Sequence, residues 1–468
     1  MKKILWLVGG LLVSLWLLVC PAYSQWSGPT VIDIDPAEDV GLHSSIVTDD
    51  AGHRHISYYD QGNGNLKYAE WDGIAWTIET VDTVGDVGQF TSIAVDDSGN
   101  VHISYFDVTN EDLKYANNIG MGWTVLAVDT TSDAGRYSSI ALDDSMRPHI
   151  SYQQEVSFLS RVLRYAWFDR NWMLETVDDA GGSGWTGAFT SIALDSQNRP
   201  HISYQNQANS DLMHAFRDVT WSIETVDNAD IGVGQYSSIA LNSNGDPGIS
   251  YLYVPSFTQM FLRYASYSGS WTIETIDSRD RCGLYTSLEY NLADEAMISY
   301  NGAATGDLRF AWDSAGTWLL ETPDSGGNVG EYTSITADAA GCPMISYYDL
   351  DNLSLKFVDR MCAIIGVEEE QFRPRQPALW LKPSLPNPAL GRTRITYQLP
   401  ASGRASLTVY SVGGRRVRTL VDDTQEAGRG WVEWDGKDDS GHALPSGVYL
   451  YRLKYKGQVL CKSLVLLQ

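Results

Sequence analysis

Hydrophobic and polar residues along this chain form short runs separated by clusters of glycine, asparagine and aspartate. Between residues 76 and 116 the runs read WTIETV, TSIAV, HISYF and LKYA. They are rich in valine, isoleucine, threonine, tyrosine and tryptophan, which is typical of β-strands bounded by tight turns. Helical periodicity does not compete with this pattern. The pattern therefore predicts an all-β structure built from groups of four short strands.

The same group of four runs recurs along the chain. The copies open on a tryptophan, at Trp26, Trp76, Trp123, Trp172, Trp221, Trp271 and Trp318. They close on a version of LKYA, at residues 66–69, 113–116, 163–166, 212–215, 262–265, 308–311 and 355–358. A period of about 50 residues with four strands indicates one propeller blade. The sequence therefore predicts a seven-bladed β-propeller over residues 25–361.

The lengths of the connections predict how the ring closes. Short turns join the runs inside a blade, whereas the segment after WTIET is longer and suits the passage to the next blade. The W-x-IET run is then the outermost strand. The last copy ends without such a strand, and residues 26–32 form one without a blade. We expect these two segments to pair, which removes the exposed sheet edge of an open array.

Residues 1–24 have the layout of a secretory signal peptide. Lys2 and Lys3 precede an apolar run from Ile4 to Cys20, and small residues follow before Gln25. An uncleaved membrane anchor is the alternative, for which the apolar run is short. A lipoprotein site at Cys20 is a minor alternative. We expect a secreted or cell-surface protein with no transmembrane helix after cleavage.

The charge of the chain is divided unevenly. The whole chain has a formal net charge of -25, whereas residues 384–468 contain 12 lysines and arginines against 7 aspartates and glutamates. The remainder is therefore strongly acidic. This argues against nucleic acid or an anionic membrane as the partner, because both are polyanions. We expect a monomer that binds an extracellular protein or polysaccharide.

The cysteines predict one disulfide and no metal site. Loss of the signal peptide leaves Cys282, Cys342, Cys362 and Cys461. The predicted hairpin brings Cys342 near Cys362, so we expect these two to pair. No cysteine pair has metal-ligand spacing, so zinc has no support in the sequence.

Histidines and aspartates recur at fixed positions of the repeat. The histidine of HISY, at His55, His102, His149 and His201, is replaced by glycine or methionine in three copies, which favours packing over catalysis. An aspartate ends every W strand, at Asp33, Asp82, Asp129, Asp178, Asp227, Asp277 and Asp324. We expect these carboxylates to accept backbone N–H groups at the turn. The alternative is a ring of carboxylates that binds Ca²⁺ as the one cofactor to consider.

Residues outside the repeat are the better candidates for ligand binding, because loops carry function on a shared scaffold. An insertion at 181–189 presents Trp185. Longer segments at 153–160 and 253–260 are expected to be loops that carry Phe158, Tyr253 and Phe257. All four aromatic residues are expected on the blade-linking face, where they would stack on sugars, grip a protein or pack against neighbouring loops.

A second domain follows a spacer. Residues 362–385 contain a charge run and several prolines, which favours an extended linker. Alternation returns over residues 386–468, where about seven short strands predict a compact sandwich. NPALGRTRITYQLP, VYSVGGRRVRTLV and WDGKDDSGHALPSGVYLYRL resemble the FlgD-like immunoglobulin-like domain and the C-terminal sorting domain of type IX secretion cargo. The resemblance implies export or surface attachment through the secretion machinery.

The function is expected to be recognition. The repeated positions contain no unique catalytic constellation, so we assign no catalytic residues and expect a non-enzymatic binding module. A glycan-active propeller enzyme, either a hydrolase or a lyase, is the alternative, and a purely structural surface protein is a third. Two carboxylates about 5 to 9 Å apart in a deep pocket would favour the hydrolase.

Overall fold

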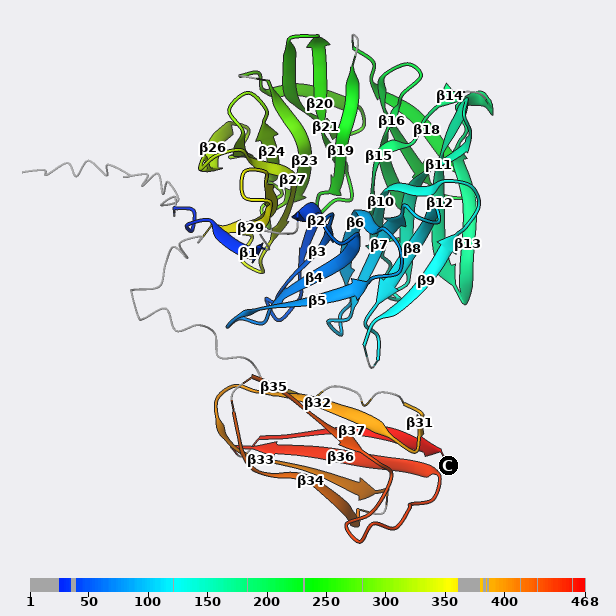
Figure 1. Cartoon of the computed structure of the whole chain (residues 1–468), viewed down its shortest axis with the longest axis vertical. Helices are drawn as coiled ribbons and strands as arrows, with labels where there is room; N and C mark the ends of the chain where they lie inside the picture. The colour runs from blue at the N-terminus through cyan, green and yellow to red at the C-terminus, as the bar shows by residue number, and fades with distance from the viewer. Residues whose placement is uncertain are drawn as a thin grey trace, which may run out of the picture.

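The computed structural model shows two all-β domains (Figure 1). It describes residues 25–34, 39–120, 122–182, 184–229, 232–279, 281–360, 379–381, 384, 387–412, 414–426, 428–456 and 458–467. The predicted signal peptide, most of the predicted linker and Cys362 lie outside these ranges. Within them, no helix is long and apolar enough to cross a membrane.

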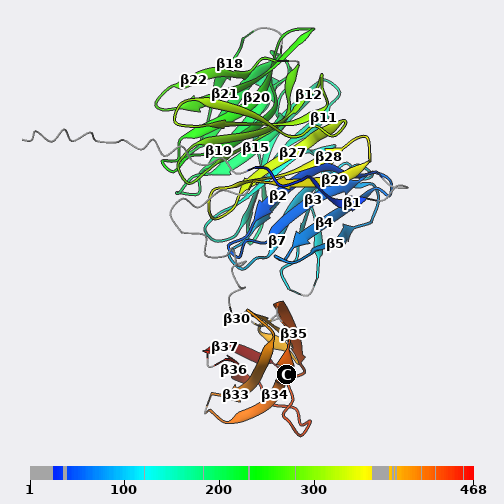
Figure 2. The same ribbon diagram turned by 90° about the vertical axis from the view of Figure 1, so that its left-hand side faces the viewer.

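Residues 25–360 form seven sheets of consecutive strands, which we number as blades one to seven along the chain (Figures 1 and 2). Blade one contains β2 (Val40–Thr48), β3 (Arg54–Asp60), β4 (Asn65–Trp71) and β5 (Trp76–Asp82). Blade two contains β6 (Val87–Val95), β7 (Val101–Asp107), β8 (Asp112–Asn117) and β9 (Thr124–Asp129). Blade three contains β10 (Ala134–Leu142), β11 (Pro148–Ser157), β12 (Ser160–Asp169) and β13 (Asn171–Asp178).

The remaining blades repeat this order. Blade four contains β15 (Ala188–Leu194), β16 (Pro200–Asn206), β17 (Asp211–Arg217) and β18 (Trp221–Asp227). Blade five contains β19 (Val233–Leu241), β20 (Pro247–Ser256), β21 (Gln259–Tyr267) and β22 (Trp271–Asp277). Blade six contains β23 (Cys282–Tyr290), β24 (Ala296–Gly302), β25 (Asp307–Asp313) and β26 (Trp318–Asp324). Blade seven contains β27 (Val329–Ala337), β28 (Pro343–Asp349), β29 (Ser354–Asp359) and β1 (Thr30–Ile34).

The ring closes as the sequence predicts. β1 pairs antiparallel with β29, with Thr30 opposite Phe357 and Val31 opposite Lys356. Both ribbon views place β1 beside β29 (Figures 1 and 2). The backbone N–H of Ser27 also donates to Asp359 at 2.7 Å. The N-terminal strand is therefore the outermost strand of blade seven, and the fold is a seven-bladed β-propeller closed by that strand.

The glycine before each innermost strand's central bulge is required by close packing between blades. In blade two, Gly88 has φ +112°, and a Cβ there would lie 2.9 Å from Leu66 Cα of blade one. The equivalent glycine of every blade meets the leucine of the preceding LKYA strand in the same way, at Gly41, Gly135, Gly187, Gly234, Gly283 and Gly330. A side chain at this position would push two blades apart.

A serine two residues after each bulge ties neighbouring blades together. The Ser45 hydroxyl accepts from the Ile93 backbone N–H of the next blade at 3.3 Å. Equivalent bonds run round the whole ring, from the N–H groups of Ile140, Ile192, Ile239, Leu288, Ile335 and Ile46. The repeated Ser of the TSIAV run is therefore explained by a contact between blades.

Two expected loops are extended strands instead. β11 and β12 continue to Ser157 and Ser160, and β20 and β21 continue to Ser256 and Gln259. These two hairpins rise from the blade-linking face of blades three and five. The insertion in the fourth copy adds β14 (Gly184–Trp185), which pairs with β12 and follows the short 3-10 helix η1 (Ala180–Gly182). Backbone pairing explains the difference, because both strands of each hairpin lengthen together.

The C-terminal domain is a two-sheet sandwich. One sheet contains β30 (Trp380–Leu381), β32 (Thr393–Leu399) and β35 (Gly428–Trp434). The other contains β31 (Ala389–Leu390), β37 (Gln458–Leu467), β36 (Gly447–Tyr455), β33 (Gly403–Ser411) and β34 (Arg416–Gln425). Trp434, Leu407 and Tyr451 are completely buried between them. Since β30 pairs with β32, this domain includes residues that the sequence assigns to the linker.

Candidate ligand site in the central channel

Seven aromatic side chains, one from each innermost strand, form a closed ring in the channel. They are His43, Phe90, Tyr137, Phe189, Tyr236, Tyr285 and Tyr332. Centroids of neighbouring rings lie 4.4 to 4.7 Å apart all the way round, including His43 to Tyr332 across the junction of blades one and seven. We call this set the aromatic ring. Such spacing gives each pair a stabilising edge-to-face or tilted contact.

A bulge in each innermost strand turns these aromatic side chains into the channel. Phe90 has φ +52°, and the register between β6 and β7 shifts on either side of it, between Val87 and Gln89 and between Gln89 and Ser92. The other six ring residues have φ between +49° and +55°. A bulge reorients a side chain that would otherwise alternate with its neighbours. The repeated Gly-x-aromatic sequence therefore encodes the ring.

The aromatic ring borders a cavity of about 180 Å³. Its other lining residues are the serine or threonine after each ring residue: Ser44, Thr91, Ser138, Thr190, Ser237, Thr286 and Thr333. Several of these hydroxyls already bind the neighbouring blade, as Ser138 donates to the Phe90 carbonyl at 2.8 Å. Among the described residues, the cavity lining contains no carboxylate and no lysine or arginine. The cavity is therefore aromatic and uncharged.

Burial controls the titration of the ring. It lowers the pKa of His43 to about 3, so this imidazole is neutral at pH 7. Burial, together with the nearby Tyr332, raises the pKa of Tyr236 to about 12. Burial also raises the pKa of Tyr285 and Tyr332. These tyrosines keep their hydroxyl hydrogens and act as hydrogen-bond donors.

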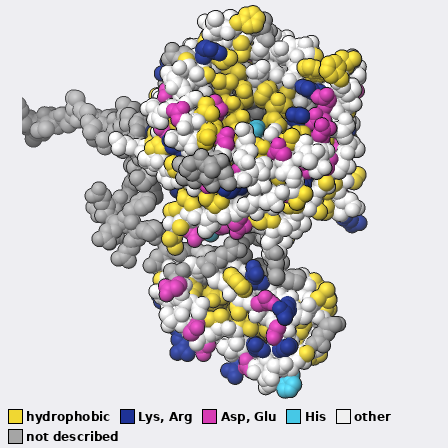
Figure 3. All heavy atoms as spheres, in the orientation of Figure 1, with side chains coloured by type: hydrophobic (Ala, Val, Ile, Leu, Met, Phe, Trp, Pro, Cys, Tyr) yellow, Lys and Arg dark blue, Asp and Glu magenta, His cyan; other side chains and the backbone are white. Residues whose placement is uncertain are grey.

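In the space-filling view, hydrophobic side chains gather towards the middle of the visible propeller face (Figure 3).

The repeated aspartates lie between blades. The Asp82 carboxylate accepts the Val84 N–H at 3.0 Å, as predicted, and also the Tyr105 hydroxyl and the Lys114 ammonium of the next blade at 2.7 and 2.5 Å. A tyrosine donates in the same way to Asp33, Asp129, Asp178, Asp227, Asp277 and Asp324. These carboxylates are occupied by protein groups, which disfavours the Ca²⁺ alternative.

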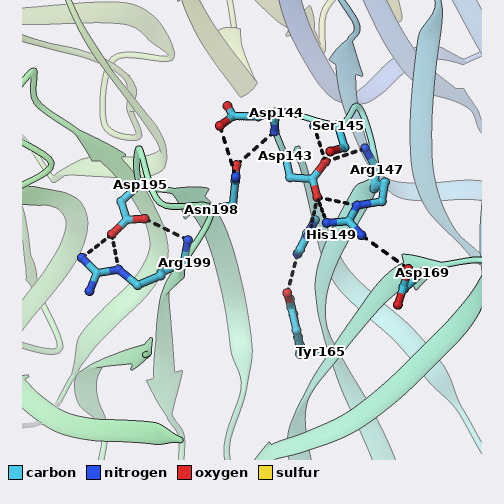
Figure 4. A network of polar contacts seen from close by, with 10 residues as sticks. All are labelled: Asp143, Asp144, Ser145, Arg147, His149, Tyr165, Asp169, Asp195, Asn198 and Arg199. Atoms are coloured by element: carbon cyan, nitrogen blue, oxygen red, sulfur yellow. Dashed lines mark hydrogen bonds and ion pairs between the residues drawn. The ribbon is translucent and has the colours of Figure 1, made fainter. Parts of the chain in front are cut away.

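The four HISY histidines are buried and bonded within their own blades. The Nδ1 atom of His102 lies 2.5 Å from the Tyr115 hydroxyl, and His149 contacts Tyr165 in the same way (Figure 4). His201 instead contacts His214 at 3.1 Å. The predicted packing role agrees with this burial, which isolates all four from the channel cavity.

The predicted rim residues have three different surroundings. Phe158 and Phe257 lie at the tips of the long hairpins and are 83% and 93% exposed. Trp185 is 39% exposed, and the Arg161 guanidinium lies 4.5 Å from its ring centroid. Tyr253 is only 6% exposed, so its expected exposure on a loop is corrected. It belongs to β20, opposite Phe261, and its ring packs beneath Arg263.

The aromatic ring is not among the sites predicted from the sequence. Each member lies at the third position of a Gly-x-aromatic-[Ser/Thr] sequence just before the SIA run, for example Gly88 to Thr91. The sequence does contain a signal for the ring: an aromatic residue recurs at this position in every copy, although the alternation of the strand does not predict one there. The pairing of Cys342 with Cys362 stays a prediction. Cys342 is disulfide-bonded and its partner lies outside the described residues, as does Cys362. Among the described cysteines, Cys282 and Cys461 are free thiols.

Comparison with solved structures finds matches of low sequence identity. A Dyadobacter fermentans protein of unknown function is 9% identical, covering 73% of this chain and 100% of its own, with a TM-score of 0.46. The SapL1 lectin in complex with alpha methyl fucoside is 12% identical, covering 63% and 98%, with a TM-score of 0.44. A PL25 ulvan lyase is 12% identical, covering 72% and 94%, also with a TM-score of 0.44. A search of curated protein sequences finds no match.

The second domain matches a family directly. Residues 388–458 match the FlgD Ig-like domain. Apart from Asn387, this range includes the three sequence segments on which the resemblance rests, and it agrees with the observed two-sheet sandwich. The C-terminal part of the chain is therefore a FlgD Ig-like domain.

Proposed function

We propose that the propeller is a carbohydrate-binding module that holds one sugar ring against the aromatic ring. The observation that carries the proposal is the closed set of seven aromatic side chains beside an uncharged cavity. Aromatic faces stack on the C–H faces of sugars, and tyrosine hydroxyls and a neutral imidazole supply hydrogen bonds to sugar hydroxyls. A charged ligand would find no ionic partner in this lining.

The size of the cavity limits what enters. Its volume of about 180 Å³ is below the roughly 300–1,000 Å³ of pockets that enclose drug-sized ligands. One monosaccharide unit, such as the end of a chain, suits this volume better than an oligosaccharide. The exposed Phe158 and Phe257 would contact further parts of a polysaccharide, because their hairpins extend from the blade-linking face.

Binding without hydrolysis fits the cavity chemistry. Glycoside hydrolases need two carboxyl groups about 5 to 9.5 Å apart across the scissile bond. The described residues that line the cavity contain none. Glu331 lies beside the ring, where its charge adds to the larger effect of burial in raising the pKa of Tyr285. Asp39 also acts on Tyr332, but neither carboxylate lines the cavity, so they do not form the pair across a bound sugar that hydrolysis requires.

The remaining parts of the chain would deliver this module outside the cell. We expect residues 1–24 to direct export and the FlgD Ig-like domain to act as a type IX sorting signal or surface attachment. The propeller would then meet extracellular polysaccharides as a monomer. The competing proposal is a purely structural surface protein, which would bind no ligand in the cavity.

A glycan array with the wild-type chain tests the proposal. Phenylalanine occupies two ring positions naturally, so Tyr236→Phe with Tyr285→Phe keeps the packing and removes two hydroxyls. We expect binding of a glycan with a neutral terminal sugar, weakened about tenfold or more in this double variant, and no released product. Trp185→Ala, a control at the rim, should retain monosaccharide binding. A silent array, or binding unaffected by the double variant, would overturn the proposal, and turnover would favour the enzyme alternative.

A further inference from the structure

Blade one contains a cluster of side chains that the other blades lack. Asp49 and His53 lie in the turn between β2 and β3, and His55 is the second residue of β3. One ligand atom from each of the three lies within 4.8 Å of the others. The turn is at the end of the innermost strand opposite the blade-linking segments, so this cluster lies on the other face from the rim hairpins.

The Asp49 carboxylate lies close to both imidazoles. Asp49 Oδ2 lies 3.2 Å from His53 Nδ1 and 3.6 Å from His55 Nε2. Tetrahedral zinc with bonds of about 2.0–2.1 Å separates neighbouring ligand atoms by about 3.3 Å. Glu70 Oε1, from the strand position opposite His55, lies 3.9 Å from His53 Nδ1 and offers a fourth oxygen. The spacing therefore suits a metal ion held by two imidazoles and a carboxylate.

Two of the three ligands, Asp49 and His55, are oriented by the surrounding protein. Asp49 Oδ1 accepts the backbone N–H groups of Ala51 and His53 at 2.9 and 2.8 Å, which leaves Oδ2 turned towards the imidazoles. His55 Nδ1 lies 2.6 Å from the Tyr68 hydroxyl. An outer hydrogen bond of this kind fixes the tautomer of a metal-binding histidine.

The cluster contains a buried nitrogen without a hydrogen-bond partner. His55 is 2% exposed, and its Nε2 has no hydrogen-bond partner although it points at Asp49. A buried polar atom without a partner is costly, and a bound metal would remove that cost. His102 Nε2 in blade two is also unsatisfied, so the distinguishing feature of blade one is His53.

The other blades show what normally occupies the place of His53. Asn100 in blade two, Arg147 in blade three and Arg199 in blade four donate to the turn aspartate from that position. Figure 4 shows the arginine version, in which Arg147 binds Asp143 beside His149. These donors occupy the carboxylate oxygen, whereas His53 contributes a nitrogen that can bind a metal when it is neutral.

We propose that Asp49, His53 and His55 form a Zn²⁺ site that links the β2–β3 turn to the interior of blade one. Imidazole nitrogens with a carboxylate oxygen are the ligand set that zinc prefers in proteins without cysteine ligands. Partial exposure of His53 and Asp49 gives the ion a path from solvent. Without metal, His53 and Asp49 form an ion pair, and their contact raises the pKa of His53.

Zinc titration of the untagged, metal-stripped chain at pH 7.5 tests the proposal. We expect one equivalent to bind with a dissociation constant on the order of 1 µM or lower. His53→Asn introduces the side chain found in blade two and should weaken binding about 100-fold. Co²⁺ should give the visible absorption of a tetrahedral site in the wild type alone.

A matched gain-of-site variant uses blade three. Arg147→His places a third ligand beside Asp143 and His149, so a second zinc equivalent is expected. His53→Arg, the side chain of blades three and four, is the second loss variant if the asparagine variant unfolds. Absence of stoichiometric binding in the wild type, or equal binding in folded His53 variants, would overturn the proposal and leave an ion pair only.

Discussion

At the scale of single residues, a buried or half-buried aspartate joins each blade to the next. In most blades the carboxylate meets a lysine or arginine as well as the tyrosine, as Asp82 meets Lys114 and Tyr105. Burial alone would raise the pKa of Asp82, but bonds from Lys114, Val84 and Tyr105 outweigh it and lower that pKa. The charge is therefore stabilised only while its partners are in place. In blade four, Met213 occupies the position of Lys114, so Asp178 has no such cation.

This difference predicts unequal costs for the same substitution. Asp82→Asn removes the charge opposite the buried Lys114, whose other carboxylate, Asp107, is 3.4 Å away. We expect a loss of about 2–4 kcal/mol in the free energy of unfolding. Asp178→Asn weakens hydrogen bonds from Tyr204, Thr186 and the Ala180 N–H but leaves no buried cation unpaired, so it should cost about 1–2 kcal/mol. Urea unfolding measures both, and equal costs would contradict an ionic contribution at Asp82.

At the scale of elements, the innermost strand combines three tasks in five residues. Gly88 allows the approach to Leu66, Phe90 contributes to the aromatic ring and Ser92 binds the next blade. The positive φ of Phe90 makes the backbone locally unfavourable, and packing on both sides holds it. This strand therefore has the least tolerance for substitution in the repeat.

Glycine-to-alanine variants test this claim within one blade pair. Gly88→Ala introduces both strain at φ +112° and an overlap at 2.9 Å with the Leu66 backbone, so we expect a loss of about 3 kcal/mol. Gly73→Ala, in a turn at φ +92°, meets no atom within 4 Å and should cost only about 1 kcal/mol. The comparison needs thermal or urea unfolding of both variants. Similar losses would show that backbone strain, and not contact between blades, decides the cost.

At the scale of the whole molecule, closure depends on a strand from the opposite end of the propeller. β1 supplies Ile32 to the core between blades seven and one, and Trp26 packs against Phe310 with a ring-centroid separation of 5.0 Å. The Trp26 indole N–H also donates to Glu321 at 2.7 Å. The N-terminal segment therefore closes a sheet edge and fills a gap between blades.

Removal of residues 25–34 should open the ring. The free edge of β29 would then be available for pairing with other chains, so we expect a lower melting temperature and oligomers in light scattering. Replacement of Val31, an exposed residue of β1, by threonine is the matched control and should leave a monomer. A truncated chain that stays monomeric with an unchanged melting temperature would refute this role of β1.

The sequence by itself determined the blades, their number and the closure of the ring. Each follows from local information, because strand alternation, turn residues and the period of the repeat are properties of neighbouring positions. The second domain was recognisable for the same reason, since Trp434 to Gly436 and Pro445 to Tyr449 keep their order along the chain.

Only the tertiary structure decided where the chemistry lies. The aromatic ring needs a bulge in every blade and seven blades around one axis, so residues as far apart as His43 and Tyr332 become neighbours. The zinc ligands are close in sequence, but the sequence does not show that His55 Nε2 is unsatisfied or that it lies near Asp49, and only His53 distinguishes blade one from the three other blades with a histidine at the HISY position. Tyr253 was expected on the rim but lies in the interior, because the pairing of β20 with β21 continues past it. Contacts between distant segments depend on shape and packing, which residue spacing does not encode.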